Sequence, residues 1–360
     1  MKKTSILIGI GNDFELTNNF FEHLLALPNI SDYEIISIVD GDYSYRTLKY
    51  LQQKSKNHPN FQYQCLNERK GYSKVNNFAA SIATNDFLLF INSDVFPTSG
   101  SIEGMSSYLQ NNPSVGLVQG LLLYPQNDTV QSTGHIFGSY FNRHALEGRS
   151  RNDSLVNKIQ ERQGLTSAFY MIDRNLFTDL GGFDEFYFNS WDGLDFSLKV
   201  YFSGKKCIYY PKSVGYHIRG GTRNFIANNE SQQSAYFWSK WGKLLKNDLV
   251  NILNSQLTKV KCHNSFLVIN CSLITELEDF IDLLEVKYST IISIRDRFSN
   301  KIDLYLNLSH AIQNYRGDLL FVVNNFMEIK RNRRWILARN NKNDLVVDFS
   351  GNIFSLIDIV

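Results

Sequence analysis

The residues best suited to chemistry are three polar side chains that end an apolar run. The segment "DFLLFINSD" covers Asp86–Asp94, and its apolar centre has the composition of a buried strand. Asn92, Ser93 and Asp94 complete the segment. Polar groups at the carboxyl end of a strand project into the crevice where open α/β sheets bind ligands. A carboxylate there can hold a divalent cation, and the cation can hold a diphosphate.

Two further segments carry groups that suit a nucleotide. The segment "EIISIVDGD" reads as a strand ending in Asp40 and Asp42. A carboxylate there can accept hydrogen bonds from a base N–H or ribose hydroxyls, although an Asp after a strand is also a common turn or capping residue. Gly71, Lys74 and Asn77 lie at the start of a helix that we expect to face the same crevice. Lys74 can neutralise phosphate there or be solvated.

The acidic and basic residues of the middle of the chain suit proton transfer and anion binding. Asp192 and Asp195 are three residues apart, so both can face the same side of a helix start. A carboxylate there can remove a proton from a hydroxyl within hydrogen-bond reach. His217 can ligate a metal, although a His after a strand is more often structural. Arg219 and Arg223 can bind phosphates, and the glycines between them allow that loop to close.

The elements that must position these residues alternate in type along the first third of the chain. Apolar spacing predicts strands over 5–12, 34–42, 61–67 and 86–92, with helices over 14–27, 45–55 and 73–83. Strands that alternate with helices indicate an α/β fold with a doubly wound, mostly parallel sheet.

The middle of the chain is less regular. Residues 115–125 read as one or two strands, and the polar residues 126–162 as a mobile loop region. A strand and a short helix follow over 165–183, then a helix over 192–206 and a strand over 207–211. A basic, aromatic helix over 234–253 can pack on the preceding domain or lie on an anionic membrane surface.

Residues from about 260 alternate again and indicate a separate small α/β domain. We therefore divide the chain into 1–233, a linker helix over 234–258, and an accessory domain over 259–360. "IISIRD" (291–296) echoes "IISIVD" (35–40), and "GDLLFVVNN" (317–325) echoes "NDFLLFINS" (85–93). The domain can be a degenerate repeat of the first, with Phe326 in place of Asp94, or its buried strands can merely share a composition. Either way, we expect it to serve acceptor recognition or assembly into a homo-oligomer.

The bulk composition limits the partners and the compartment. A net charge of +2 gives no sign of nucleic-acid binding. The four cysteines form no paired motif, which favours a reducing compartment. No apolar run approaches transmembrane length. We expect a soluble cytoplasmic protein. The alternative is a cytoplasmic protein that binds peripherally to the inner face of the membrane.

Taken in order, these motifs resemble those of family 2 glycosyltransferases of the GT-A fold, over about residues 5 to 223. The resemblance implies that Asp40 holds the base or ribose and that Asp94 ligates Mn²⁺ or Mg²⁺, with His217 as second ligand. Asn92 stands where the family has the first Asp of its Asp-x-Asp metal motif. Asp192 can align with the family's Glu, in which case Gly193 aligns with the family's catalytic Asp. With a gap of one residue, Asp192 aligns with that catalytic Asp itself.

The resemblance implies an inverting, hexosyltransferase-type reaction of the bacterial surface-glycan or glycoprotein kind. A sugar would move from a nucleotide-sugar donor, with UDP-sugar favoured, to a hydroxyl of a sugar-bearing glycan, glycolipid or glycoprotein acceptor. Asp192 would be the base, and Asp195 would support the site or substitute for it. Two alternatives stay open. One is a sugar nucleotidyltransferase. The other is a non-catalytic binding or scaffold protein descended from a transferase, which Asn92 and Gly193 favour.

Overall fold

The chain divides into two compact units. The N-terminal unit consists of residues 1–135 and 147–243, and the C-terminal unit of residues 136–146 and 244–360. The computed structural model describes residues 2–41, 43–138, 141–218, 230–248, 251–252, 266–270, 291–294, 318–323 and 344–355. The expected end of the first domain at residue 233 falls inside a helix, α7 (Glu230–Trp241). No sequence pattern indicated that residues 136–146 belong to the second unit.

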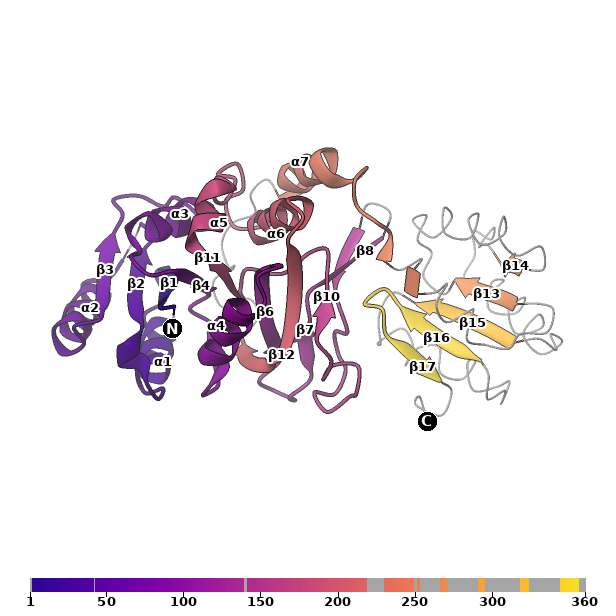
Figure 1. Cartoon of the computed structure of the whole chain (residues 1–360), viewed down its shortest axis with the longest axis horizontal. Coiled ribbons are helices and arrows are strands. Elements are labelled where there is room, and N and C mark those ends of the chain that lie inside the picture. The colour runs from indigo at the N-terminus through magenta and orange to yellow at the C-terminus, as the bar shows by residue number, and fades with distance from the viewer. Residues whose placement is uncertain are drawn as a thin grey trace. The chain divides into compact units, whose positions relative to one another are not determined.

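One large sheet organises the N-terminal unit (Figure 1). Its strands lie in the order β10-β12-β6-β11-β4-β1-β2-β3. Neighbouring strands from β4 to β3 are parallel, whereas β11 runs antiparallel to both β4 and β6. The short strands β5 and β7 pair with β12 and β6. The bounds are β1 (Thr4–Ile10), β2 (Glu34–Val39), β3 (Phe61–Cys65), β4 (Phe87–Ile91), β5 (Val95–Pro97), β6 (Val115–Leu123), β7 (Val130–Ser132), β10 (Gln160–Glu161), β11 (Phe169–Asp173) and β12 (Lys206–His217).

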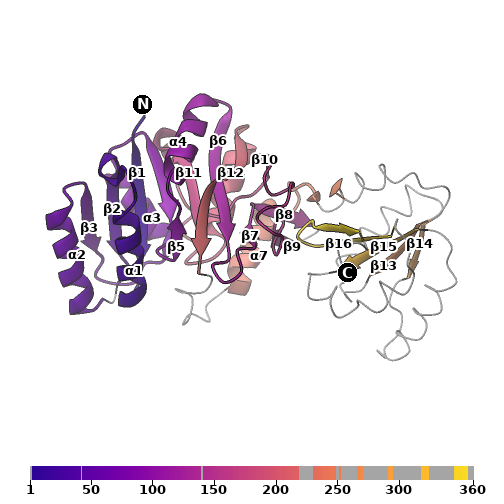
Figure 2. The same ribbon diagram turned by 90° about the horizontal axis from the view of Figure 1, so that it is seen from below.

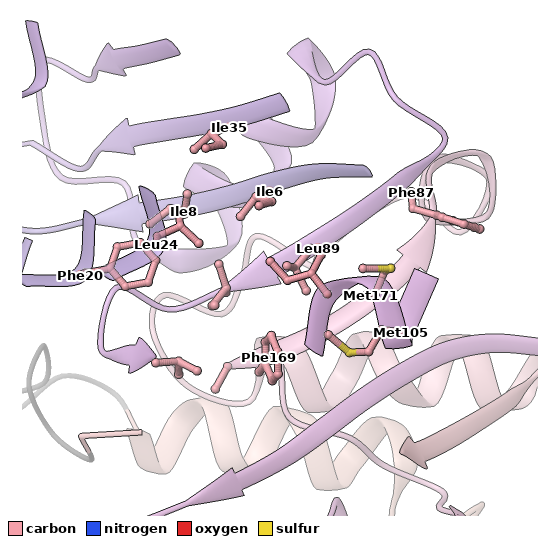
Figure 3. Close-up of a cluster of buried hydrophobic side chains, with 14 of the residues drawn as sticks. Ile6, Ile8, Phe20, Leu24, Ile35, Phe87, Leu89, Met105, Phe169 and Met171 are labelled. Atoms are coloured by element: carbon pink, nitrogen blue, oxygen red, sulfur yellow. The ribbon is translucent and has the colours of Figure 1, made fainter. Parts of the chain in front are cut away.

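Helices cover both faces of this sheet (Figures 1 and 2). Ile6 and Ile8 of β1 pack into one core with side chains of α1, α2 and α4, as Figure 3 shows for part of that core. Leu7 packs into the other core with α3, α5 and α6. Strands buried on both faces explain the continuous apolar runs. The helices are α1 (Phe14–Leu25), α2 (Tyr45–Asn57), α3 (Tyr72–Ile82), α4 (Ser101–Asn111), α5 (Arg174–Asp179) and α6 (Asp192–Phe202).

The expected order of strands and helices in the first third is confirmed, but the rest of the chain differs from expectation in three places. Helix α4 was not predicted. The polar region 126–162 contains β7 and β10, and also β8 (His135–Gly138) and β9 (Phe141–His144), which pair with each other. The helix expected over 234–253 ends at Trp241, where the poor helix former Gly242 begins a turn.

The C-terminal unit contains a five-stranded sheet in the order β14-β13-β15-β16-β17. Strand β13 lies parallel between β14 and β15, as β1 lies between β2 and β4. The echoing strands thus occupy matching places in their sheets. The residues between these strands, and Phe326, lie outside the described residues, so the repeat stays a prediction. The bounds are β13 (Phe266–Asn270), β14 (Ile291–Ile294), β15 (Asp318–Val323), β16 (Leu345–Asp348) and β17 (Ile353–Ser355).

Candidate active site

The two acidic segments meet at one edge of the N-terminal sheet. Strand β4 ends there, and the backbone N–H of Asn92 donates to the carbonyl of Ala168, 3.0 Å away, at the entry to β11. The preceding residue, Ser167, donates through its hydroxyl to Oδ1 of Asp192 at 3.5 Å. Asp192 and the segment ending in Asp94 therefore both contact residues 167–168, at the carboxyl end of β4.

The pairing of β5 with β12 brings Asp94 beside His217. His217 pairs with Val95, and the backbone N–H of Ile218 donates to the Asp94 carbonyl at 2.9 Å. The Asp94 side chain is 2% exposed, and its Oδ1 lies 3.2 Å from Nε2 of His217. Among the described residues, this oxygen accepts no hydrogen bond. The structure thus brings together the two residues predicted to ligate a metal.

The geometry of this pair fits a divalent cation. Adjacent ligands of an octahedral ion with bonds of about 2.1 Å lie about 3 Å apart, close to the 3.2 Å between Asp94 Oδ1 and His217 Nε2. Carboxylate oxygen and imidazole nitrogen also suit Mn²⁺. Within the described ranges, no group of three or more His, Cys, Asp or Glu side chains could hold a metal. An ion here would need ligands besides Asp94 and His217, and phosphate oxygens and water can supply them.

Asp40 fixes the start of α3. Its two carboxylate oxygens accept the backbone N–H groups of Lys70 at 2.6 Å and of Gly71 at 3.0 Å. Gly71 has φ +82°, and a Cβ there would lie 2.5 Å from the Phe188 carbonyl, so only glycine fits. Lys74 is exposed in the first turn of this helix. These contacts place the expected donor-binding residues at the same edge of the sheet, and their roles stay predictions.

The other predicted donor-binding residues differ in their position and contacts. The Asn77 amide accepts from the backbone N–H of Phe183 at 2.9 Å and donates to its carbonyl at 3.0 Å, so it fixes the loop before α6. Ser93 is buried, and Asn92 is half-buried at the end of β4. The remaining three, Asp42, Arg219 and Arg223, lie outside the described residues.

Asp192 is the first residue of α6 and is 5% exposed. Its neighbour Gly193 cannot carry a side chain, because a Cβ there would lie 2.8 Å from the backbone N of Ser167 and against its hydroxyl. The first of the two alignments places the family's catalytic Asp at position 193. An Asp side chain at that position would clash with Ser167. Burial, followed by the charge of Asp192, raises the pKa of Tyr72, which lies nearby. Asp192 is therefore the acidic residue that begins α6, and its role as base stays a prediction.

Replacing Gly193 with Ala is expected to destabilise the protein. The added methyl group must displace Ser167 and the backbone that carries it, and overpacking of this kind costs about 1–3 kcal/mol. Urea unfolding would measure the loss. Gly148→Ala is a suitable control, since a Cβ there meets nothing within 4 Å and only the strain of its positive φ of +84° contributes. Equal losses in both variants would contradict the steric argument.

Asp195 anchors α7 to α6. Its side chain is fully buried, and Oδ1 accepts from Trp241 Nε1 at 2.7 Å and from Tyr187 Oη at 3.3 Å, with Lys240 Nζ at 2.8 Å. These contacts favour the supporting role over that of a substitute base. Trp241 and Lys240 belong to the basic and aromatic face of α7, so this face packs on α6. Trp241 is 8% and Phe237 0% exposed. This burial favours packing on the domain over the membrane-surface alternative.

Two residues of α7, Tyr236 and Lys240, hydrogen-bond to the carboxylate of Asp184. These contacts make the stability of the fold depend on pH in the acid range. Burial raises the pKa of Asp184, but hydrogen bonds from the Phe186 N–H, Lys240 and Tyr236 outweigh it, and the pKa is lowered. Its contribution is complete above the unfolded-state pKa and is lost as pH falls through the folded-state value. Asp184→Asn should therefore reduce the free energy of unfolding by about 1 kcal/mol at pH 7.

The difference between wild type and Asp184→Asn should shrink as the pH falls from 7 toward 3. Denaturant titrations at several pH values would measure it. Asp179→Asn, at an exposed carboxylate, is the matched control and should show little difference at any pH. If the difference in free energy of unfolding between wild type and Asp184→Asn stays constant across this pH range, the charge of Asp184 does not have this role.

Sequence reasoning missed the residues that connect the site. Ser167 and Tyr72 join Asp192 to α3, since Tyr72 Oη donates to the Ser167 carbonyl at 3.1 Å. Gln131 of β7 contacts His217 from a segment expected to be a loop. A single sequence gives no signal for any of the three, because each contact joins segments far apart in the chain.

Comparisons with known proteins agree with this architecture. Residues 5–176 match the model of the family described as "Glycosyl transferase family 2". The O-antigen biosynthesis protein RfbC of Myxococcus xanthus is 26% identical over 236 residues, which cover 64% of this chain. The chain spans only 18% of the length of that curated relative.

Two solved structures are similar in fold. One is GalNAc-T7 with UDP, GalNAc and Mn²⁺, with a TM-score of 0.52 and 15% identity, covering 60% of this chain and 44% of that one. The other is the mannosyltransferase PcManGT from Pyrobaculum calidifontis in complex with GDP-Man and Mn²⁺. It has a TM-score of 0.52 and 13% identity, covering 88% of this chain and 81% of that one. At these identities the likeness extends to the fold alone.

Proposed function

We propose that this chain transfers a hexosyl group from a nucleotide sugar to an acceptor hydroxyl, with inversion, because residues 5–176 match the model of glycosyltransferase family 2 and the N-terminal unit has the GT-A fold. We favour a UDP-sugar donor and a sugar-bearing acceptor in a surface glycan, glycolipid or glycoprotein. The name of the Myxococcus relative supports the polysaccharide acceptor. We further propose a cytoplasmic location.

One observation carries the proposal: the segment that ends in Asp94 and the helix start at Asp192 both hydrogen-bond to residues 167–168, at the carboxyl end of β4. Asn92, two residues before Asp94, is hydrogen-bonded to Ala168, and Asp192 is hydrogen-bonded to Ser167. An inverting transfer needs a group that holds the donor diphosphate and a base that faces the acceptor. We assign the first function to Asp94, which lies between β4 and β5. We assign the second to Asp192, which begins α6.

The proposed reaction needs no enzyme nucleophile. The Asp192 carboxylate accepts the proton of the acceptor hydroxyl as its oxygen attacks the anomeric carbon. A bond forms between that oxygen and the anomeric carbon, and the bond from the carbon to the diphosphate oxygen breaks. Attack from the face opposite the leaving group inverts the configuration. The nucleoside diphosphate leaves with the bonding electron pair, and alignment of donor and acceptor supplies much of the rate gain.

Asp94 and His217 are the residues that would hold Mn²⁺ or Mg²⁺. When bound, such an ion neutralises negative charge on the departing diphosphate. The Mn²⁺ in both similar structures supports this proposal. Asn92 supplies a neutral amide in place of a second carboxylate, so we expect weaker ion binding than two carboxylates would give. Asp40, Gly71 and Lys74 are the residues that we propose for the nucleoside and phosphates.

The test is a thermal-shift screen of UDP-, GDP- and dTDP-sugars with and without Mn²⁺, followed by product analysis with the donor that binds. A bound donor should raise the melting temperature, and the effect should need the metal. Release of pyrophosphate from a sugar 1-phosphate and a nucleoside triphosphate would instead indicate a nucleotidyltransferase. Binding of nucleotides without turnover of any donor would indicate a scaffold protein.

A further inference from the structure

We propose that Gln131 is a positioning residue for His217, and that it selects the imidazole tautomer able to ligate a metal. The inference rests on the proposed metal site of Asp94 and His217. Gln131 lies in β7 and is 2% exposed. It belongs to the polar segment that was expected to be a loop. Its amide touches both the backbone and the ring of His217.

The two contacts fix the orientation of the amide. Nε2 of Gln131 donates to the backbone carbonyl of His217 at 3.2 Å. The NH₂ group must face that carbonyl, because a carbonyl oxygen can only accept. Oε1 of Gln131 therefore faces Nδ1 of the His217 ring, with which it forms a short contact. Since the amide oxygen can only accept as well, the proton of a neutral His217 ring lies on Nδ1.

This tautomer leaves a lone pair on the nitrogen that faces Asp94. Nε2 of His217 lies 3.2 Å from Oδ1 of Asp94, and that oxygen accepts no hydrogen bond within the described part of the chain. Two electron-pair donors then lie 3.2 Å apart, a separation that suits adjacent ligands of one divalent cation. In the other tautomer, a proton on Nε2 would occupy the lone pair that a metal ion needs. Gln131 opposes that state.

The size of the expected effect follows from other metal sites. A metal-ligating His usually donates its second N–H to an oxygen, and loss of that partner typically weakens metal binding 10- to 100-fold. Gln131→Leu keeps the approximate volume and removes both hydrogen bonds. Gln131→Glu keeps an acceptor for Nδ1–H. The buried Gln119 is the matched control, because its amide oxygen accepts a backbone N–H, that of Thr166, at 2.8 Å and its contacts do not include His217.

The experiment measures Mn²⁺ affinity from the electron paramagnetic resonance signal of free Mn²⁺, with UDP present. We expect Gln131→Leu to weaken binding by about 10- to 100-fold, Gln131→Glu to retain most of it, and Gln119→Leu to match wild type. Wild-type Mn²⁺ affinity in a folded Gln131→Leu variant would overturn the inference and leave the proposed function intact. A wild-type protein that binds no Mn²⁺ would overturn the metal site itself.

A second measurement keeps the inference testable even where Gln131→Leu does not fold. Long-range ¹H–¹⁵N spectra of the metal-free wild type report which ring nitrogen of His217 carries the proton. We expect the Nδ1–H form. A neutral ring protonated at Nε2 would overturn the role of Gln131, whatever the metal affinity of the variants.

Discussion

Asp192→Asn is expected to lower the turnover number about 10²- to 10⁴-fold while leaving nucleotide binding intact, because a positioned general base contributes about that much. The amide has the volume of the carboxylate and keeps an oxygen for the hydrogen bonds from Ser167 and the Gly193 N–H. It cannot take the acceptor proton. Initial rates with saturating donor would measure the first effect, and calorimetric titration with the nucleotide the second.

Asp195→Asn is the matched control, one turn further along α6. Its buried carboxylate holds Trp241 and Lys240, so we expect a loss of about 2–3 kcal/mol in the free energy of unfolding. Activity per folded molecule should change less than in Asp192→Asn. A reversed pattern, with turnover lost in Asp195→Asn and kept in Asp192→Asn, would make Asp195 the base and contradict the assignment drawn from burial.

The sequence distinguished the strands of the N-terminal unit far better than the roles of single residues. Strands β1 and β4 are buried on both faces, so their apolar runs are long and unmistakable. Helix α4 has no such signal, because it contains Gly104 and three serines. It forms where Gly104 packs closely on β12, since a Cβ there would lie 2.9 Å from the Ser213 hydroxyl. Tertiary packing overrides a weak local preference.

The candidate site shows the same limit. Asp192 and Asp195 share one helix start, and no local pattern tells them apart. Their difference comes from Trp241, which lies 46 residues after Asp195 and donates to it. The contact of Gln131 with His217 spans 86 residues. Family resemblance located Asp94 and His217, but the polar groups that tune them depend on strand pairing that a single sequence does not reveal.

Asp94→Asn is expected to weaken Mn²⁺ binding by at least about 100-fold and to lower turnover by about 10²- to 10³-fold, the usual cost of losing one group that stabilises developing charge. Asn92 is already neutral, so the change removes the last carboxylate from the segment that ends β4. The amide fits the same buried space, and we expect the melting temperature to stay close to that of wild type. Mn²⁺ titration and initial rates would measure the two effects.

Asn92→Asp tests the same site in the opposite direction. It restores a carboxylate two residues before Asp94, at a half-buried position directly after β4. Added negative charge should tighten Mn²⁺ binding, since ligand charge count sets the affinity of oxygen sites for hard cations. If affinity rises in Asn92→Asp and falls in Asp94→Asn, both side chains face one ion. If neither substitution changes it, the ion binds elsewhere, and the contact between Asp94 and His217 serves the fold alone.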